Sequence, residues 1–258
     1  MAATEKVKDV LWRISVLLQD TTPQFQRWPE KELVHALNDG QTNIAKFLPL
    51  ACSRIVSMKL RAGTLQSIAA IAAADCKLED GSTPSDTTYG VQFLNPRCNM
   101  GSTGTTVGSA IRMVERDVMD SQDPDWHMRT ASSVSSVIYD PMTPRNFHVT
   151  PGVTGTVWMR LALTAKPTAI PNTGTPGSEL YANSGASTTT ISIDDEFVPE
   201  LVDYVVARAN LKDVKYASKQ TADLHTNRFL ASLNAKVAAV TGTNPNLTIL
   251  PGVTPQAA

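Results

Sequence analysis

The chain has 258 residues, enough for one or two domains with a buried core, and 42% of them are apolar, 18% charged and 6% aromatic. Its 23 Lys and Arg against 24 Asp and Glu leave a formal charge of −1, without the basic excess of a dedicated nucleic-acid binder. Polar residues interrupt every apolar stretch and the first residues lack a signal-peptide pattern, so we expect neither a membrane span nor secretion by that route.

Two helices are predicted at the start of the chain. Residues 4–18 carry apolar side chains at helical spacing, behind a possible N-terminal cap at Thr4. After a turn at residues 20–23, Pro29 and Glu30 mark the start of a second helix that continues to Leu48. Together these segments predict a helical hairpin.

The middle of the chain is predicted to be rich in β structure. Residues 53–60 alternate as a strand does, whereas residues 69–74 are compatible with strand or helix. Residues 80–106 are rich in Gly, Ser, Thr, Pro and Asn, which predicts a loop with a short strand at 91–94. Helical spacing of Ile111, Val114 and Val118 predicts one short helix near 108–120.

Three further strands are expected after this helix, because apolar and polar residues alternate between proline-containing turns. They are residues 134–139, 145–149 and 156–163, which we interpret as an antiparallel meander. Residues 164–190 are predicted to be a long loop, of the kind that is functional or orders on assembly.

The last third returns to helices and then to an extended tail. An acidic start at residues 194–196 opens a helix that breaks near Asn210, and another helix follows to about residue 240. Residues 241–258 contain three prolines, which exclude a helix and favour an extended arm. Its apolar residues need cover from a neighbouring subunit or another protein, and they are the predicted partner interface: Leu247, Ile249, Leu250 and Val253.

The fold class predicted from these elements is α+β, with terminal helices forming an antiparallel bundle around an inserted β-rich domain. The expected domains are a discontinuous helical one (1–50 and 191–240), a β-rich insertion (51–190) and a C-terminal arm (241–258).

Catalytic, metal and cofactor motifs are not found. The carboxylates between Glu115 and Asp125 could serve a glycosidase, but charge runs near turns are usually solvated surface. The four histidines lack ligand spacing. The three cysteines lack a CxxC pair and fit a reducing compartment, with Cys52 and Cys98 expected as small buried groups. The four tryptophans are expected in the core. We therefore expect no enzyme activity, no metal and no cofactor.

Several blocks, in this order, resemble the head-to-tail connector (adaptor) proteins of tailed bacteriophages, particularly those with short tails. The blocks are Leu17-Leu18-Gln19-Asp20, Arg27-Trp28, Glu32-Leu33, Leu37 to Gln41, Leu48-Pro49, Leu60 to Gln66, Ile111 to Val114, Pro124 to His127, Tyr139-Asp140, Pro144 to Phe147, Thr150-Pro151, Asp194 to Phe197, Leu201 to Val205, Arg208-Ala209, Lys212-Asp213 and Phe229. The alanine-rich run at 69–74 and the length of the loop at 164–190 depart from the pattern.

The resemblance implies a structural virion protein, made in the host cytoplasm and placed in the neck between head and tail. It implies a homo-oligomeric ring, typically of twelve copies, that docks under the portal protein, receives the tail nozzle or tube protein and extends the DNA channel without binding DNA specifically. Two alternatives remain open: a phage receptor-binding or decoration protein, expected as a trimer, and a muralytic tail enzyme that uses Glu115, Asp120 or Asp123.

Overall fold

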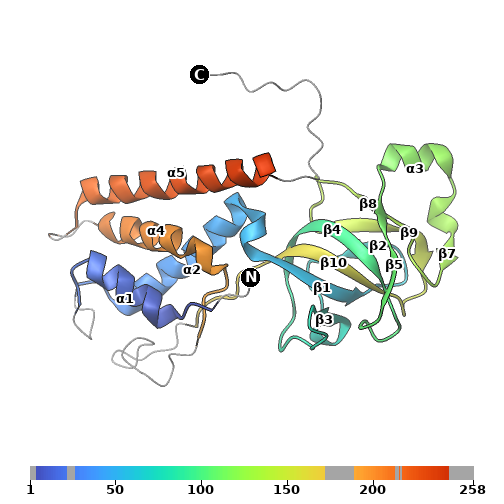
Figure 1. Ribbon diagram of the computed structural model, residues 1–258, viewed down its shortest axis with the longest axis horizontal. Helices are drawn as coiled ribbons and strands as arrows, with labels where there is room; N and C mark the ends of the chain where they lie inside the picture. Colours follow the sequence, from blue (N-terminus) through green and yellow to red (C-terminus); the bar gives the residue numbers. More distant parts are fainter. Residues whose placement is uncertain (1–3, 22–26, 172–188, 213–214, 216, 244–258) are drawn as a thin grey trace. The chain divides into compact units, whose positions relative to one another are not determined.

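The computed structural model describes residues 4–21, 27–171, 189–212, 215 and 217–243. The chain forms two compact units (Figure 1): residues 1–48 with 169–258, called the helical unit, and residues 49–168, called the β unit. The α+β class is therefore confirmed. The units meet in sequence at residues 48/49 and 168/169, while the division at 50 and 191 stays a prediction about folding domains.

Four helices make up the described part of the helical unit, and the third of them contacts the other three. They are α1 (Val7–Leu17), α2 (Glu30–Phe47), α4 (Val198–Asn210) and α5 (Lys219–Thr243), with the short 3-10 helix η5 (Asp195–Phe197) before α4. Leu201, Val205 and Val206 of α4 are completely buried, as is Leu37 of α2. The four predicted helices are thus confirmed, and no described helix is long and apolar enough to cross a membrane.

The two ends of the helical unit differ from the prediction. Helix α5 continues to Thr243, three residues into the predicted extended arm, because the first proline comes only at position 245. Helix α1 starts at Val7 behind Lys6, which makes no side-chain cap, so the predicted cap at Thr4 is wrong. Residues 244–258 lie outside the described part of the chain.

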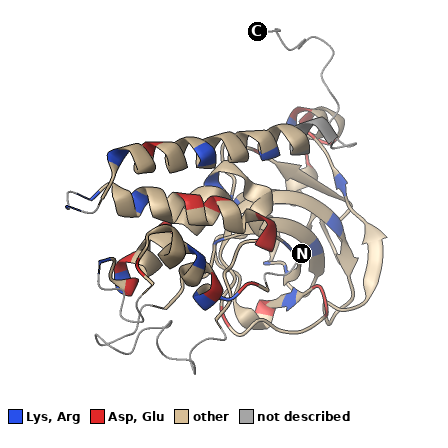
Figure 2. Ribbon diagram, turned by 60° about the vertical axis from the view of Figure 1, so that its left-hand side comes forward, with Lys and Arg blue, Asp and Glu red and all other residues tan. Residues whose placement is uncertain are grey.

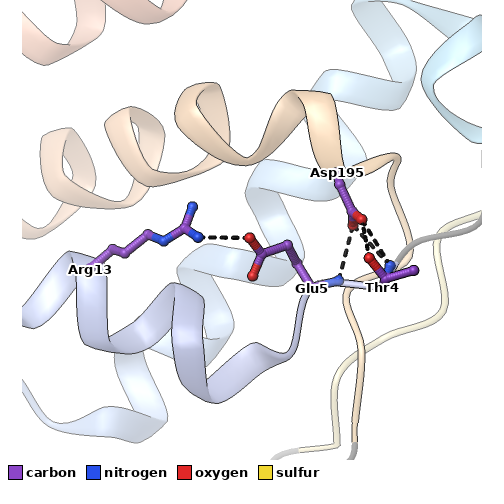
Figure 3. A network of polar contacts seen from close by, with 4 residues as sticks. All are labelled: Thr4, Glu5, Arg13 and Asp195. Carbon is purple, nitrogen blue, oxygen red and sulfur yellow. Dashed lines mark hydrogen bonds and ion pairs between the residues drawn. The ribbon is translucent and has the colours of Figure 1, made fainter.

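Thr4 binds a distant segment instead of its own helix. The Asp195 carboxylate accepts hydrogen bonds from the backbone N–H groups of Thr4 (2.9 Å) and Glu5 (3.0 Å) and from the Thr4 hydroxyl (Figure 3). Glu5 in turn accepts from Arg13 at 2.7 Å. Backbone hydrogen bonds from Val7 to Thr189 and from Ile191 to Glu5 complete this junction, which joins the two segments of the helical unit.

The β unit contains two sheets. The first has the strand order β3-β1-β10-β4-β5, and the second has β2-β9-β8-β6, with β7 paired to β9. The strands are β1 (Ser53–Lys59), β2 (Gly63–Ser67), β3 (Cys76–Leu78), β4 (Gly90–Met100), β5 (Val107–Ala110), β6 (Arg112–Met113), β7 (Thr130–Ala131), β8 (Ser136–Tyr139), β9 (Asn146–Val153) and β10 (Trp158–Ala165). The short helix η1 (Pro49–Cys52) precedes the first strand, and three others lie between strands: η2 (Ala73–Asp75), α3 (Arg116–Gln122) and η3 (Trp126–Met128).

The short strand predicted at 91–94 is confirmed but is only part of the eleven-residue strand β4, so the predicted loop at 80–106 is wrong over the rest of this strand, to Met100. This strand pairs on both sides, with β10 and with β5, although it contains Pro96. The register shifts next to the pair Leu161 and Pro96, and such irregularities admit a residue that has no N–H to donate. Tertiary pairing here outweighs a composition that favours loops.

The predicted helix near 108–120 is also wrong in position. Residues 107–113 form β5 and β6, and α3 begins only at Arg116. Of the three apolar residues whose spacing suggested a helix, only Ile111 is buried, whereas Val118 is 40% exposed. Their helical spacing is accidental, because each strand here is fixed by its partner strand.

The predicted meander is correct for β8 and β9, which form an antiparallel pair. It is wrong for β10, which pairs with β1 and β4 in the other sheet. Strand β10 is buried along nearly its whole length, so it occupies the centre of its sheet instead of an edge. Both sheets contribute to one apolar core that includes Phe93, Phe147 and Leu161.

Three side-chain amides each bind both the N–H and the C=O of one other residue, as a paired strand would. Asn99 holds both backbone groups of Val134 at 2.8 and 2.7 Å, and Gln66 holds those of Arg61 at 2.8 Å each. In the helical unit, Asn38 holds Ile170 at 2.8 and 3.1 Å. These amides fix irregular segments whose backbone groups have no strand or helix partner there.

Candidate interaction surface of the helical unit

Helix α1 is apolar on two faces. One face is buried in the helical unit and includes Val10, Leu11 and Ile14. The other leaves Trp12 45%, Val16 49% and Leu17 51% exposed. The sequence pattern accounts for the first face only, since a single stripe suffices for packing on one side.

The exposed face of α1 forms one wall of a groove of about 490 Å³, which we call the α1/α4 groove. Its other wall comes from the first turns of α4, and its edge from the first half of α5. The lining residues are Trp12, Arg13, Val16, Leu17, Val198, Pro199, Val202, Asp203, His225 and Arg228. The walls are mainly apolar. Arg13 on the α1 wall pairs with Glu5, whereas Asp203, His225 and Arg228 form a charged side on α4 and α5.

The charged side of the groove is held in place by contacts between α4 and α5. The Nδ1 atom of His225 lies 2.6 Å from Oδ1 of Asp203, and Nε of Arg228 lies 3.9 Å from Oδ2 of the same carboxylate. Asp203 therefore has partners of its own within the helical unit.

A second, smaller hollow of about 320 Å³ lies between α2 and α4. There Lys212 pairs with Glu32 and stands 5.6 Å above the ring of Trp28. Burial lowers the pKa of Lys212 below its ordinary value. The basic group is thus already engaged within this unit, which makes this hollow a weaker candidate for partner binding.

Three of the four tryptophans predicted in the core are in fact buried. Trp28, Trp126 and Trp158 are buried, and Trp12 is not. Helical spacing alone could not distinguish the exposed Trp12 from the buried residues Val10 and Leu11 that precede it. The partner residues predicted in the tail, Leu247, Ile249, Leu250 and Val253, lie outside the described residues.

The carboxylates considered for catalysis lie at or near the surface of the β unit, around α3. Asp120 accepts a hydrogen bond from the Trp126 indole N–H at 2.8 Å, and this bond is the main cause of its lowered pKa. Asp123 pairs with Arg129 at 3.0 Å. None of the carboxylates from Glu115 to Asp125 is buried.

Folding does bring two of the four histidines together, although 21 positions separate them in sequence. The ring of His127 stacks on Trp126 with centroids 3.5 Å apart, and His148 lies 6.3 Å from His127. Burial lowers the pKa of His148, and the positive charges of Arg116 and His127 lower it further. Within the described parts of the chain, no group of three His, Cys, Asp or Glu could hold a metal ion.

The three cysteines form no disulfide. Cys52 and Cys76 are buried, and burial raises the pKa of the Cys76 thiol, which keeps it protonated. Cys98 is only half-buried, so the expectation of a small buried group holds for Cys52 and in part for Cys98.

Acidic and basic residues are interspersed along the helices in the view of Figure 2. Counted over the sequence, the helical unit has a formal charge of −2 and the β unit one of +1. The helical unit thus combines an apolar groove with nearly balanced charges.

The family model of the SU10 adaptor protein matches residues 6–248. The chain therefore belongs to the SU10 adaptor family of phage head-to-tail adaptors, and the resemblance inferred from the sequence blocks is confirmed. No curated protein sequence matches the chain significantly.

Proposed function

We propose that this chain is the subunit of a head-to-tail adaptor ring, which docks under the portal and provides the attachment site for the tail nozzle or tube. The observation that carries the proposal is the family match, which spans both the helical unit and the β unit. The ring is homo-oligomeric, of about twelve copies, and belongs to the neck of the virion.

Two features of the chain support this role. The near-neutral charge of both units suits a channel that must let DNA pass, because each phosphate neutralised by Lys or Arg adds affinity that would slow ejection. The terminal helices, as an antiparallel bundle, supply a frame for lateral packing, with the α1/α4 groove on its surface. The arm after Thr243, with Leu247, Ile249, Leu250 and Val253, reaches a neighbouring subunit or the portal.

The test is negative-stain imaging of the purified chain, alone and mixed with purified portal protein. We expect rings of about twelve copies seated on the portal, and a pull-down that weakens when residues 241–258 are deleted. Trimers that ignore the portal would favour the receptor-binding or decoration protein instead. Clearing of peptidoglycan in a zymogram, lost in Asp120→Asn or Glu115→Gln, would favour the muralytic enzyme.

A further inference from the structure

The β unit carries a flap on its second sheet. Residues 115–129, which we call the α3 flap, leave this sheet after β6 and return to it at β7. Backbone hydrogen bonds fix its two ends, from the Val114 N–H to Val137 and from the Gly152 N–H to Arg129. Figure 1 shows α3 projecting from the strands of the β unit. The flap is thus tied to the sheet at both ends, and its attachment in between decides whether it stays closed.

One side chain attaches the middle of the flap to the sheet. Trp126 is 1% exposed, and it is the only buried residue of the flap, all of which the structure describes. Its indole N–H donates to Asp120 within the flap, at 2.8 Å, so this bond does not hold the flap to the sheet. Burial of the Trp126 ring is therefore the main attachment between the two fixed ends.

Trp126 packs on His148 of β9, on the face of the sheet that points away from the core. Phe147 and Val149, on either side of His148, belong to the core between the sheets, so the His148 side chain points outward. The rings of Trp126 and His148 meet edge to face, with centroids 5.8 Å apart. The ring of His127 stacks on Trp126 at 3.5 Å and lies 6.3 Å from His148. The three rings form one cluster where the flap meets the sheet.

The surroundings of His148 suit its neutral form. Its Nδ1 atom is buried and makes no hydrogen bond with any described residue, whereas a protonated imidazole has two N–H groups to satisfy. The flap presents two positive groups to His148, which are Arg116 of α3 and His127 of η3. The residues that pair with His148 on the adjacent strands, Leu65 of β2 and Ile138 of β8, are apolar. Burial is the main cause that lowers the pKa of His148, and the two positive groups lower it further.

The other elements at this place offer no compensating charge. Asp120, the carboxylate that acts on His127, already accepts the hydrogen bond from Trp126 and pairs with Arg116 at 3.5 Å. Strand β7, which pairs with the end of β9, carries no charged residue. A proton on His148 would therefore leave a buried N–H and a positive charge without a partner while the flap is closed.

We propose that the α3 flap is an acid-sensitive latch, closed while His148 is neutral and opened when His148 takes up a proton. Opening carries Trp126, His127 and Arg116 away from the His148 ring and lets water reach it. Because the pKa of His148 is lower with the flap closed, acid favours the open state as the pH falls below the ordinary His value of about 6.5. One proton per opening event raises the ratio of open to closed flap by up to about 10-fold per pH unit. The latch lies within the β unit, so the inference does not depend on the proposed ring.

The test is fluorine NMR of the full-length chain labelled with fluorotryptophan, with each resonance assigned from a Trp→Phe variant. The readout is the shift of each resonance between H2O and D2O, which reports contact of the ring with water and not the charge on His127. We expect this solvent shift to grow at Trp126 from about pH 7.5 to about pH 5, with the dependence of a single proton. Trp158, which is 7% exposed and belongs to the other sheet of the same unit, is the internal control and should not change.

Three variants assign the response to His148. His148→Gln keeps a neutral side chain of similar size, and should keep Trp126 away from water at about pH 5. Arg116→Gln, at a side chain that is 62% exposed, removes one positive charge that faces His148. It should reduce the acid response by up to about 5-fold, the size of an exposed charge effect. The matched control is His35→Gln in the helical unit, at an exposed histidine, which should leave the response unchanged.

Several outcomes would overturn the inference. An acid response that persists in His148→Gln would do so, as would a response of equal size at Trp126 and Trp158, which would indicate unfolding of the whole unit. A wild-type chain in which Trp126 gains no contact with water down to about pH 5 would also contradict it. If His148→Gln does not fold, the comparison of Arg116→Gln with His35→Gln decides, and equal responses in these two variants would reject the latch.

Discussion

The two units solve the problem of a compact core in different ways. The helical unit joins segments more than a hundred residues apart, but each helix satisfies its own backbone and needs its neighbours only for side-chain contacts. The β unit is continuous in sequence, yet each of its strands depends on a partner strand for its hydrogen bonds. The comparison teaches that contiguity in sequence does not make a unit locally determined.

The largest expected effect comes from emptying either core. Leu201→Ala in α4 and Leu161→Ala in β10 should each lower the free energy of unfolding by ~2–5 kcal/mol, because both side chains are completely buried. Denaturant titration measures the loss. If the units are independent, hydrogen exchange should rise only in the unit that carries the substitution, and a rise in both units would break the comparison.

A second comparison concerns the amides that bind distant backbone groups. Asn99→Ala should cost about 2–4 kcal/mol, because it leaves the buried N–H and C=O of Val134 without their partner. The matched change Asn38→Ala should cost less, because Asn38 is half-buried and water can replace it at Ile170. Thermal unfolding of both variants checks this order, and equal losses would contradict it.

Two glycines test close packing in the two units. Gly104 has φ +77°, and an added Cβ would lie 2.6 Å from the ring of Trp158, so Gly104→Ala should cost about 1–3 kcal/mol. In α2, an added Cβ at Gly40 would meet Leu201 at 2.7 Å, but alanine favours the helix by ~1 kcal/mol. Gly40→Ala is therefore expected to lower the stability less than Gly104→Ala. Denaturant midpoints measure both losses, and a larger loss for Gly40→Ala would contradict this order.

Acid should affect the junction of the helical unit at Asp195. The hydrogen bond from the Thr4 hydroxyl is the main cause that lowers the pKa of Asp195, with help from the backbone N–H groups of Glu5 and Thr4. A carboxyl whose pKa is lower in the folded state stabilises fully above its unfolded pKa, and this is lost as pH falls through the folded value. The loss should thus come below about pH 4.

The variant that tests this is Asp195→Ala, and Asp80→Ala is its control. Removing Asp195 should cost about 1 kcal/mol at neutral pH, as for a lost helix cap, and should flatten the acid limb of the stability curve. Asp80 also has a lowered pKa, but its main partner is Ser82, two residues away, so its removal should change stability less. Stability measured from pH 2 to 7 decides, and equal acid limbs in the wild type and Asp195→Ala would contradict the assignment.

The smallest expected effect is on DNA binding. Formal charges of −2 and +1 on the two units predict no tight, salt-sensitive binding of duplex DNA at physiological ionic strength. Fluorescence anisotropy with a labelled duplex measures it. Tight binding that falls steeply with salt would count against an adaptor whose channel passes DNA freely.

The helical unit was predictable because its signals are local. The spacing of apolar residues in α1 and α4, and Pro29 before α2, placed the helices to within about three residues. The β unit was less predictable from the sequence. Strands β4 and β5 form only because they pair across the sheet, although their composition favours loops.

The candidate site was predictable only in part. Thr4 was expected to cap its own helix, but it binds Asp195 instead. No local pattern contains this contact, which spans 191 positions. The exposure of Trp12 likewise depends on where α4 packs against α1, so the α1/α4 groove could not be predicted from the spacing of residues in α1.

The junction between Thr4, Glu5 and Asp195 also has a consequence for synthesis on the ribosome. Residues 49–168 can close their core as soon as they emerge, whereas α1 and α2 must wait for α4, which ends at residue 210. At about 5–20 residues per second, that interval lasts roughly 10–30 s. During it, the apolar faces of the first two helices are exposed to chaperones and to other nascent chains, so slowed translation between residues 49 and 210 should lower the soluble yield.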